Sequence, residues 1–221
     1  MQNLLRTLAL RGRELMNILQ PPNAVFFVGL VVQFGIRHHF IQRTKSEHKT
    51  VRQVDRLEKI LLAAVVPAAL LLPPLYCFTP LLSFADYDLP SAIRWGGAVI
   101  MIASLWLFLR SHIDLGQNWS VSLELRQDHE LVTHGVYRSI RHPMYTSIWL
   151  WGFAQGMMLS NWLAGWAVLP AFAAMYFIRT PREERLMREQ FGDGYRKYTG
   201  RTGRLMPRLR KTTGQADAPK P

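Results

Sequence analysis

The residues with the clearest chemical potential lie in two polar segments of the C-terminal half. Arg179 and Glu183 are four residues apart, so on a helix they share one face and point a cation and an anion at the same volume. His142 directly precedes Pro143, and a proline at the first helical position fits a helix start. The free N–H groups and partial positive charge of such a start suit a carboxylate. Together these residues predict a functional site at the membrane surface.

Structural explanations of the same residues stay open at this point. His142 is then an interfacial histidine, and Arg179 is an arginine that extends from the last apolar stretch to the membrane surface. The Arg179–Glu183 pair is then an ordinary ion pair, worth about 0.3–0.5 kcal/mol.

Other familiar chemistries have weak support. His129 and Glu130 with His134 resemble a zinc-protease helix, but histidines five residues apart lie on different helical faces, so we expect no metal site. The sequence holds no G-x-G-x-x-G, P-loop or G-x-S-x-G pattern. Its single cysteine, Cys77, excludes a disulfide scaffold and a cysteine-based zinc module.

The elements that must position these residues are stretches without Asp, Glu, Lys, Arg or His, at 16–36, 60–85, 95–109 and 143–178. A bilayer core of about 30 Å needs roughly 20 helical residues, and the first two stretches meet that length. The third spans the bilayer only if the arginines at its two ends extend to the interfaces. The fourth is too long for one helix and is interrupted at Ser160-Asn161-Trp162, so it predicts a helical hairpin.

These stretches predict an all-α integral membrane protein with about five transmembrane helices. Four prolines between residues 67 and 80 are expected to break or kink the second span, which neighbouring helices then cover. Leucines before residue 16 predict an interfacial helix ahead of the first span.

The position of the basic residues predicts the orientation and accounts for the net charge of +12. Alternate segments between the spans sum to 23 Lys and Arg on one side and 4 on the other. By the positive-inside rule the N-terminus lies outside and the C-terminal tail lies in the cytoplasm. Topology and attraction to anionic membrane lipids therefore explain the charge without a nucleic-acid partner.

An ordered set of motifs resembles the isoprenylcysteine carboxyl methyltransferase family, whose wider group includes the membrane phospholipid methyltransferases. The set comprises L-V-T-H-G-V-Y from Leu131, R-H-P-M-Y from Arg141, R-x3-E-E from Arg179 and F-G-x2-Y-x2-Y from Phe191. The resemblance extends over roughly residues 115–207 and is closer to the bacterial members in residues 115–126. Thr146-Ser147 stand where the prenylcysteine enzymes usually have a small residue, often glycine.

This resemblance implies that S-adenosyl-L-methionine binds at the cytoplasmic surface and that Glu183 and Arg179 are catalytic residues, with Arg179 on the substrate side. The implied cofactor contacts are His129, Glu130, Leu131, Val132, Tyr137, His142, Pro143, Met144, Tyr145 and Glu183. Residues 1–110 then form the interfacial helix and three spans. Residues 111–221 form a methyltransferase region with a cofactor-binding loop, the hairpin at 143–178 and a basic helical tail.

The expected reaction is methyl transfer to a lipophilic or lipidated acceptor, most simply a carboxylate, because a carboxylate is already ionised at pH 7. A phospholipid amine acceptor, an NADPH-dependent membrane reductase and a non-catalytic membrane scaffold are the alternatives.

Overall fold

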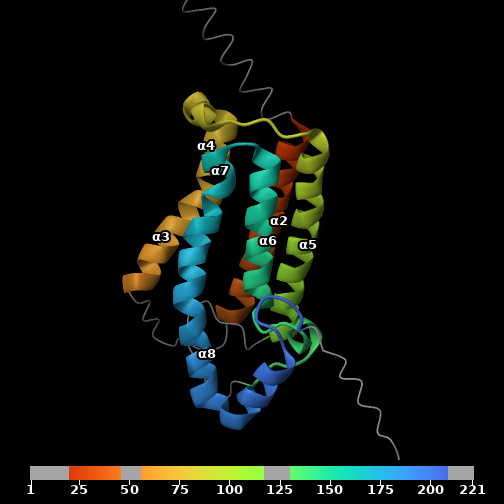
Figure 1. Ribbon diagram of the computed structural model, residues 1–221, viewed down its shortest axis with the longest axis vertical. Coiled ribbons are helices and arrows are strands. Elements are labelled where there is room, and N and C mark those ends of the chain that lie inside the picture. The colour runs from red at the N-terminus through yellow and green to blue at the C-terminus, as the bar shows by residue number, and fades with distance from the viewer. Residues whose placement is uncertain (1–19, 46–55, 117–129, 209–221) are drawn as a thin grey trace, which may run out of the picture.

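The computed structural model describes residues 20–45, 56–116 and 130–208. The expected interfacial helix before residue 16 and the expected cofactor contact His129 lie outside these ranges. The elements in chain order are α2 (Pro21–Lys45), α3 (Arg56–Leu70), α4 (Leu72–Phe78), η1 (Pro80–Ala85), α5 (Ser91–Leu115), η3 (Gly135–Arg138), α6 (Pro143–Leu159), α7 (Trp162–Trp166) and α8 (Val168–Arg201) (Figure 1).

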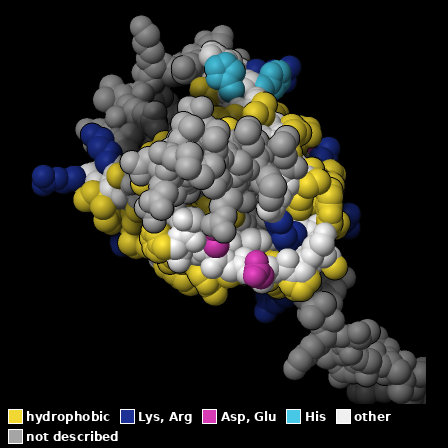
Figure 2. Space-filling model, turned by 90° about the horizontal axis from the view of Figure 1, so that it is seen from above, with side chains coloured by type: hydrophobic (Ala, Val, Ile, Leu, Met, Phe, Trp, Pro, Cys, Tyr) yellow, Lys and Arg dark blue, Asp and Glu magenta, His cyan; other side chains and the backbone are white. Residues whose placement is uncertain are grey.

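The prediction of an all-α integral membrane protein is confirmed. Four helical stretches are long and apolar enough to cross a bilayer: Pro21–Arg43, Lys59–Phe78, Ser91–Leu115 and Trp162–Arg201. Viewed along the long axis, hydrophobic side chains gather around the rim of the molecule (Figure 2). The count of five spans is approximate, because α6 has 17 residues and lies at the lower limit for a spanning helix.

The helices form a bundle that runs along the long axis of the molecule (Figure 1). α5 packs along α6, α2 packs on α5, and α3 packs on α8. The largest core cluster includes Phe26, Met101, Trp151 and Met158, each at most 3% exposed. The end of the bundle where α2, α5 and α8 finish and α6 begins is called the polar end below.

The prolines of the second span interrupt it as predicted. α3 contains Pro67 and ends at Leu70, and α4 begins at Leu72 with prolines in its first turn. A proline inside a helix removes one backbone hydrogen bond and crowds the preceding turn, so the helical path breaks here.

After residue 143 the chain forms α6, a turn with the short helix α7, and then α8. Ser160 ends α6 with a φ of 52°, in the left-handed region. The Asn161 side chain then caps α7, because its oxygen accepts hydrogen bonds from the backbone N–H groups of Leu163 and Ala164. Its amide nitrogen donates to Asp86 at 2.8 Å and so ties the turn to the segment before α5.

Arg94 has a role that its position at the end of an apolar stretch did not reveal. Instead of extending only toward the membrane surface, its guanidinium donates two hydrogen bonds to the carbonyl of Met158, at 3.1 and 2.9 Å. It also donates to the side chains of Gln20 and Asn23. Carbonyls in the last turn of a helix lack partners within the helix. Arg94 therefore caps α6 and joins it to α2 and α5.

Candidate functional site

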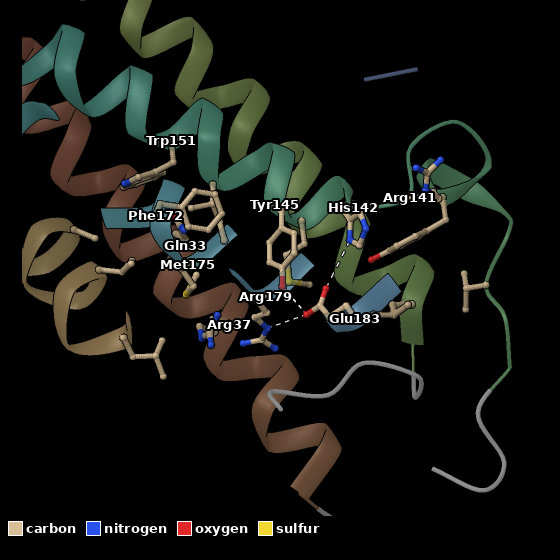
Figure 3. Close-up of a pocket in the computed structure, with 18 of the residues that line it drawn as sticks. Gln33, Arg37, Arg141, His142, Tyr145, Trp151, Phe172, Met175, Arg179 and Glu183 are labelled. Carbon is tan, nitrogen blue, oxygen red and sulfur yellow. Dashed lines mark hydrogen bonds and ion pairs between the residues drawn. The ribbon is translucent and has the colours of Figure 1, made fainter. Parts of the chain in front are cut away.

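A cavity of about 510 Å³ opens inside the bundle and reaches its polar end (Figure 3). One part is apolar and lies among α2, α3, α6 and α8, where its walls include Leu30, Val65, Ile148, Phe172 and Met175. The other part holds charged and aromatic side chains, from residues 130–145 and from α8. A single space therefore joins a charged region to an apolar one.

Glu183 is the centre of the charged part. The Arg179 Nε donates to its Oε1 at 2.8 Å, and the Tyr145 hydroxyl donates to the same oxygen at 2.5 Å (Figure 3). The other carboxylate oxygen lies 3.7 Å from His142 Nδ1. The spacing of four residues on α8 brings Arg179 and Glu183 onto one face, as predicted. The Arg179–Glu183 ion pair faces the cavity and is mostly buried, with side chains 16% and 21% exposed.

The start of α6 brings His142 and Tyr145 to this carboxylate. Pro143 occupies the first turn, as predicted, and His142 is the N-cap residue without a side-chain capping bond. The His142 ring stacks on the Tyr145 ring, with centroids 5.5 Å apart and planes 14° apart. This first turn therefore presents an imidazole, a phenol and a helix N-terminus to the cavity.

Glu184 belongs to the R-x3-E-E motif but is not among the predicted site residues. It points in a different direction from Glu183, because neighbours on a helix diverge by about 100°. Its side chain is only 5% exposed and accepts hydrogen bonds from Arg204, at 3.0 and 2.6 Å. Arg141 lies 3.4 Å away and His142 Nε2 lies 3.3 Å away. The hydrogen bond to Glu184 raises the pKa of the Arg204 guanidinium. Glu184 thus binds His142 from the side opposite Glu183.

The segment after α8 folds back to make this network possible. Gly192, with a φ of 49°, interrupts the helical path within α8. The chain then returns to the loop before α6, where the N–H groups of Arg141 and His142 donate to the carbonyls of Gly203 and Arg204. A Cβ atom on Gly203 would lie 1.7 Å from the Met206 carbonyl oxygen, so only glycine fits there.

Asp114 supports the opposite wall of the site and was not predicted. It accepts hydrogen bonds from the Val136 N–H and from Arg110, both at 2.8 Å. Gly135 has a φ of 56°, and a Cβ there would lie 2.1 Å from an Asp114 carboxylate oxygen. Glycine is therefore required both for the conformation and for the close approach.

Tyr137 lies in the adjoining 3-10 turn η3 and lines the cavity. Its backbone carbonyl accepts a 2.7 Å hydrogen bond from the Tyr198 hydroxyl. Burial raises the pKa of the Tyr137 phenol, so the side chain is neutral and offers a ring face and a hydroxyl instead of a charge.

Most of the predicted site residues lie around this one cavity. Eight of the ten expected cofactor contacts line it, and so does Arg179. Pro143 does not line the cavity but begins the helix that presents its neighbours. The polar and tyrosine lining residues outside the predicted set are Gln33 and Arg37 of α2, Arg141, Tyr195 and Tyr198. The last three belong to the quoted motifs, whereas nothing in the sequence distinguishes the two residues of α2.

The fold and the cavity define a helical integral membrane protein with a charged site at one end of the bundle. The comparisons with known proteins agree with this class. Residues 97–189 match the profile of the isoprenylcysteine carboxyl methyltransferase (ICMT) family. The resemblance predicted from the sequence is thereby confirmed.

Individual relatives and a solved structure extend this match. A rice protein, described as a probable protein-S-isoprenylcysteine O-methyltransferase, is 27% identical over 117 residues, or 52% of this chain and 61% of the relative. A methanethiol S-methyltransferase from Pseudomonas deceptionensis is 31% identical over 135 residues, or 57% of this chain and 46% of the relative. This chain thus matches about three fifths of the rice relative's length and about half of the bacterial one.

The solved structure of the eukaryotic intramembrane Ras methyltransferase ICMT superposes with a TM-score of 0.54. The superposition covers 87% of this chain and 70% of that one, at 23% sequence identity. The two proteins share the fold.

Proposed function

We propose that this protein transfers a methyl group from S-adenosylmethionine to a lipophilic carboxylate, in the manner of an isoprenylcysteine O-methyltransferase. The observation that carries this proposal is the single cavity that joins the Arg179–Glu183 cluster to an apolar space among α2, α3, α6 and α8. Such a cavity suits a charged cofactor and a lipophilic acceptor held side by side. The family match over residues 97–189 supports the same reaction.

The residues at the polar end fit the groups of S-adenosylmethionine. Glu183 offers an anionic carboxylate that faces the cavity, which suits the ammonium group. His142 and the uncapped start of α6 suit the carboxylate. The neutral ring of Tyr137 and the ring of Tyr145 suit the adenine or the sulfonium, the latter through a cation–π contact.

When bound, this cofactor supplies an electrophilic methyl group on a sulfonium centre. The protein then needs no general base for a carboxylate acceptor, because that acceptor is ionised at pH 7. Its residues contribute by orientation, which is worth several kcal/mol when reacting groups are well aligned, and by exclusion of water. Arg179 aligns the acceptor carboxylate, because it lines the cavity between the charged part and the apolar walls of α8.

The shape of the cavity favours a long acceptor over a small one. The bacterial relative is named for methanethiol, which has a single carbon atom. The apolar part here extends past Val65 and Phe172 to Trp151 and Val168, far more surface than such a molecule buries. An acceptor with an extended apolar chain fills this part and enters laterally from the membrane.

Calorimetry and labelled-methyl transfer test this proposal together. Purified protein should bind S-adenosylmethionine and S-adenosylhomocysteine, and should transfer labelled methyl to a lipophilic carboxylate in a base-labile ester. Binding of NADPH in place of S-adenosylhomocysteine would support a reductase instead. Transfer that goes only to an amine, and rises with pH through the amine's pKa, would support the phospholipid methyltransferase alternative.

The orientation is part of the same proposal. The helix ends that carry most of the basic residues lie at the polar end, so the site faces the cytoplasm and the N-terminus lies outside. Cysteines introduced at Gln2 and Thr213, in a background that lacks Cys77, should react with an impermeant reagent from opposite faces of sealed vesicles. Labelling of both from one face would refute this orientation.

A further inference from the structure

The imidazole ring of His142 lies between two carboxylates of α8. Its Nδ1 is 3.7 Å from an oxygen of Glu183 (Figure 3), and its Nε2 is 3.3 Å from an oxygen of Glu184. Glu183 lines the cavity, whereas Glu184 does not. The side chains of His142 and Glu184 are only 11% and 5% exposed. The two ring nitrogens therefore have different surroundings, Nδ1 toward the cavity and Nε2 toward a buried carboxylate.

Glu184 determines which nitrogen carries the proton of the neutral ring. Its carboxylate accepts hydrogen bonds from Arg204 at 3.0 and 2.6 Å, and Arg141 lies 3.4 Å away. A carboxylate bound by guanidinium groups is ionised and can only accept hydrogen bonds. The adjacent Nε2 of His142 must therefore be the donor. The neutral ring then has its lone pair on Nδ1, on the side of the cavity.

A lone pair on Nδ1 is poorly matched to its neighbours. Nδ1 of the neutral ring and the facing Glu183 oxygen are both acceptors, and a second proton on Nδ1 removes this mismatch. The charged and titratable groups around the ring are the carboxylates of Glu183 and Glu184, the guanidinium groups of Arg141, Arg179 and Arg204, and the phenol of Tyr145. Three cations against two anions oppose a further positive charge on the ring. A ligand carboxylate would supply a third anion and so favour the second proton.

We propose that Glu184 is a positioning residue that keeps the first proton of His142 on Nε2, so that Nδ1 takes up a second proton when the carboxylate of the cofactor binds beside it. The proton comes from solvent and stays on Nδ1, and no covalent bond between heavy atoms changes. This inference rests on the proposed function and adds a proton linkage to cofactor binding. Because the imidazolium binds the carboxylate more tightly than the neutral ring does, affinity falls as pH rises through the range in which histidine loses its charge, about pH 5–8.

Calorimetry with S-adenosylhomocysteine counts these protons. The full chain in lipid nanodiscs is titrated at about pH 7.5 in buffers of different ionisation enthalpy, and the dependence of the binding enthalpy on that enthalpy gives the number of protons taken up. We expect an uptake of about 0.5–1 proton in the wild type. In Glu184→Gln the uptake should fall by about half or more, and the pH at which affinity declines should move down by about one unit, because the anion beside the imidazolium is gone. A purely structural role of Glu184 would lower Tm without a change in either quantity.

Two histidine variants make the result specific. His142→Gln keeps an N–H donor but cannot take up a proton, so the uptake should vanish, and this variant tests the inference if Glu184→Gln does not fold. His39→Gln removes an exposed histidine of α2 outside the cavity and should leave the uptake unchanged.

Three results would overturn this inference and leave the proposed function standing. They are a binding enthalpy of the wild type that is the same in all buffers, an uptake that survives His142→Gln, and a folded Glu184→Gln with the uptake and pH profile of the wild type. A wild type that does not bind S-adenosylhomocysteine would overturn both this inference and the proposed function.

Discussion

Replacement of Glu184 by glutamine should destabilise the polar end of the protein more than it weakens any single contact with a ligand. The substitution keeps the size of the side chain and removes its charge. Arg141 and Arg204 would then face a neutral amide, and the Arg141 side chain is itself only 12% exposed. Arg141, His142 and Arg204 all contact the Glu184 carboxylate. These contacts hold the segment after α8 against the loop before α6.

The magnitude follows from burial. Removal of one partner of a buried ion pair costs about 3–5 kcal/mol, whereas an exposed pair is worth about 0–1 kcal/mol. Arg141 belongs to the first class, but the Arg204 side chain is 49% exposed and contributes less. We therefore expect a loss of about 2–4 kcal/mol in the free energy of unfolding. For a chain of this size, each kcal/mol lowers Tm by about 2–4 °C, so Tm should fall by about 4–16 °C.

Thermal unfolding in nanodiscs, followed by tryptophan fluorescence, measures this change. Glu183→Gln is the matched control on the neighbouring residue, because its carboxylate faces the cavity. It should lower Tm less than Glu184→Gln does, because the Glu183 side chain is 21% exposed against 5% for Glu184. It should lower the affinity for S-adenosylhomocysteine by about 10- to 100-fold, the worth of a charge-assisted hydrogen bond. A Tm of Glu184→Gln within about 2 °C of the wild type would refute the role assigned to this network. Equal losses of affinity in both variants, at unchanged Tm, would show that the two glutamates contribute alike to ligand binding.

Three further variants probe other parts of the molecule. Gly135→Ala should cost about 2–4 kcal/mol, because it combines a left-handed conformation with a clash against Asp114, and thermal unfolding should show it; a Tm equal to the wild type would contradict the tight turn. Arg94→Lys should lower Tm by several degrees, through loss of the forked contact with Met158, while calorimetry gives an unchanged affinity for S-adenosylhomocysteine. Arg179→Lys keeps the charge but not the planar fork, so methyl transfer should collapse while S-adenosylhomocysteine affinity stays within a few-fold of the wild type. Near-normal turnover in a correctly inserted Arg179→Lys variant would show that Arg179 has only a structural role.

The helices could be predicted because the length of a charge-free stretch is itself a physical requirement of the bilayer. The break at Ser160 and the interruption after Pro67 followed from local chemistry, a left-handed residue in one case and a missing backbone donor in the other. The Arg179–Glu183 pair followed from helical spacing alone. These features depend on residues that are neighbours in the sequence.

The features that escaped prediction depend on long-range contacts. Arg204 reaches Glu184 only because the chain reverses at Gly192, and helical spacing says nothing about that return path. Arg94 had the same appearance in the sequence as any arginine at a membrane surface, although its guanidinium caps α6. An apolar stretch such as α2 shows that it crosses the membrane, but not which face meets a cavity, so Gln33 carried no signal.

The helices α6 and α8 are connected to each other at both ends, and these connections limit their relative motion. Residues 160–167, which include α7, join these two helices at one end, and hydrogen bonds between residues 139–142 and 203–204 join them at the other. Two helices that are joined at both ends cannot separate by a hinge motion about one end. The wall that carries Glu183, His142 and Tyr145 therefore behaves as a rigid frame.

The other two walls are fastened differently. Near the end of the bundle opposite the frame's charged groups, Gln155 of α6 donates to the Ala68 carbonyl of α3, and Arg94 links Asn23 of α2 to α6. α2 and α3 are also held nearer the polar end, because α3 packs on α8 and the Phe40 ring of α2 lies 5.0 Å from the His112 ring of α5. The walls of the cavity are thus joined to this frame at more than one level, which keeps the spacing of its charged groups fixed.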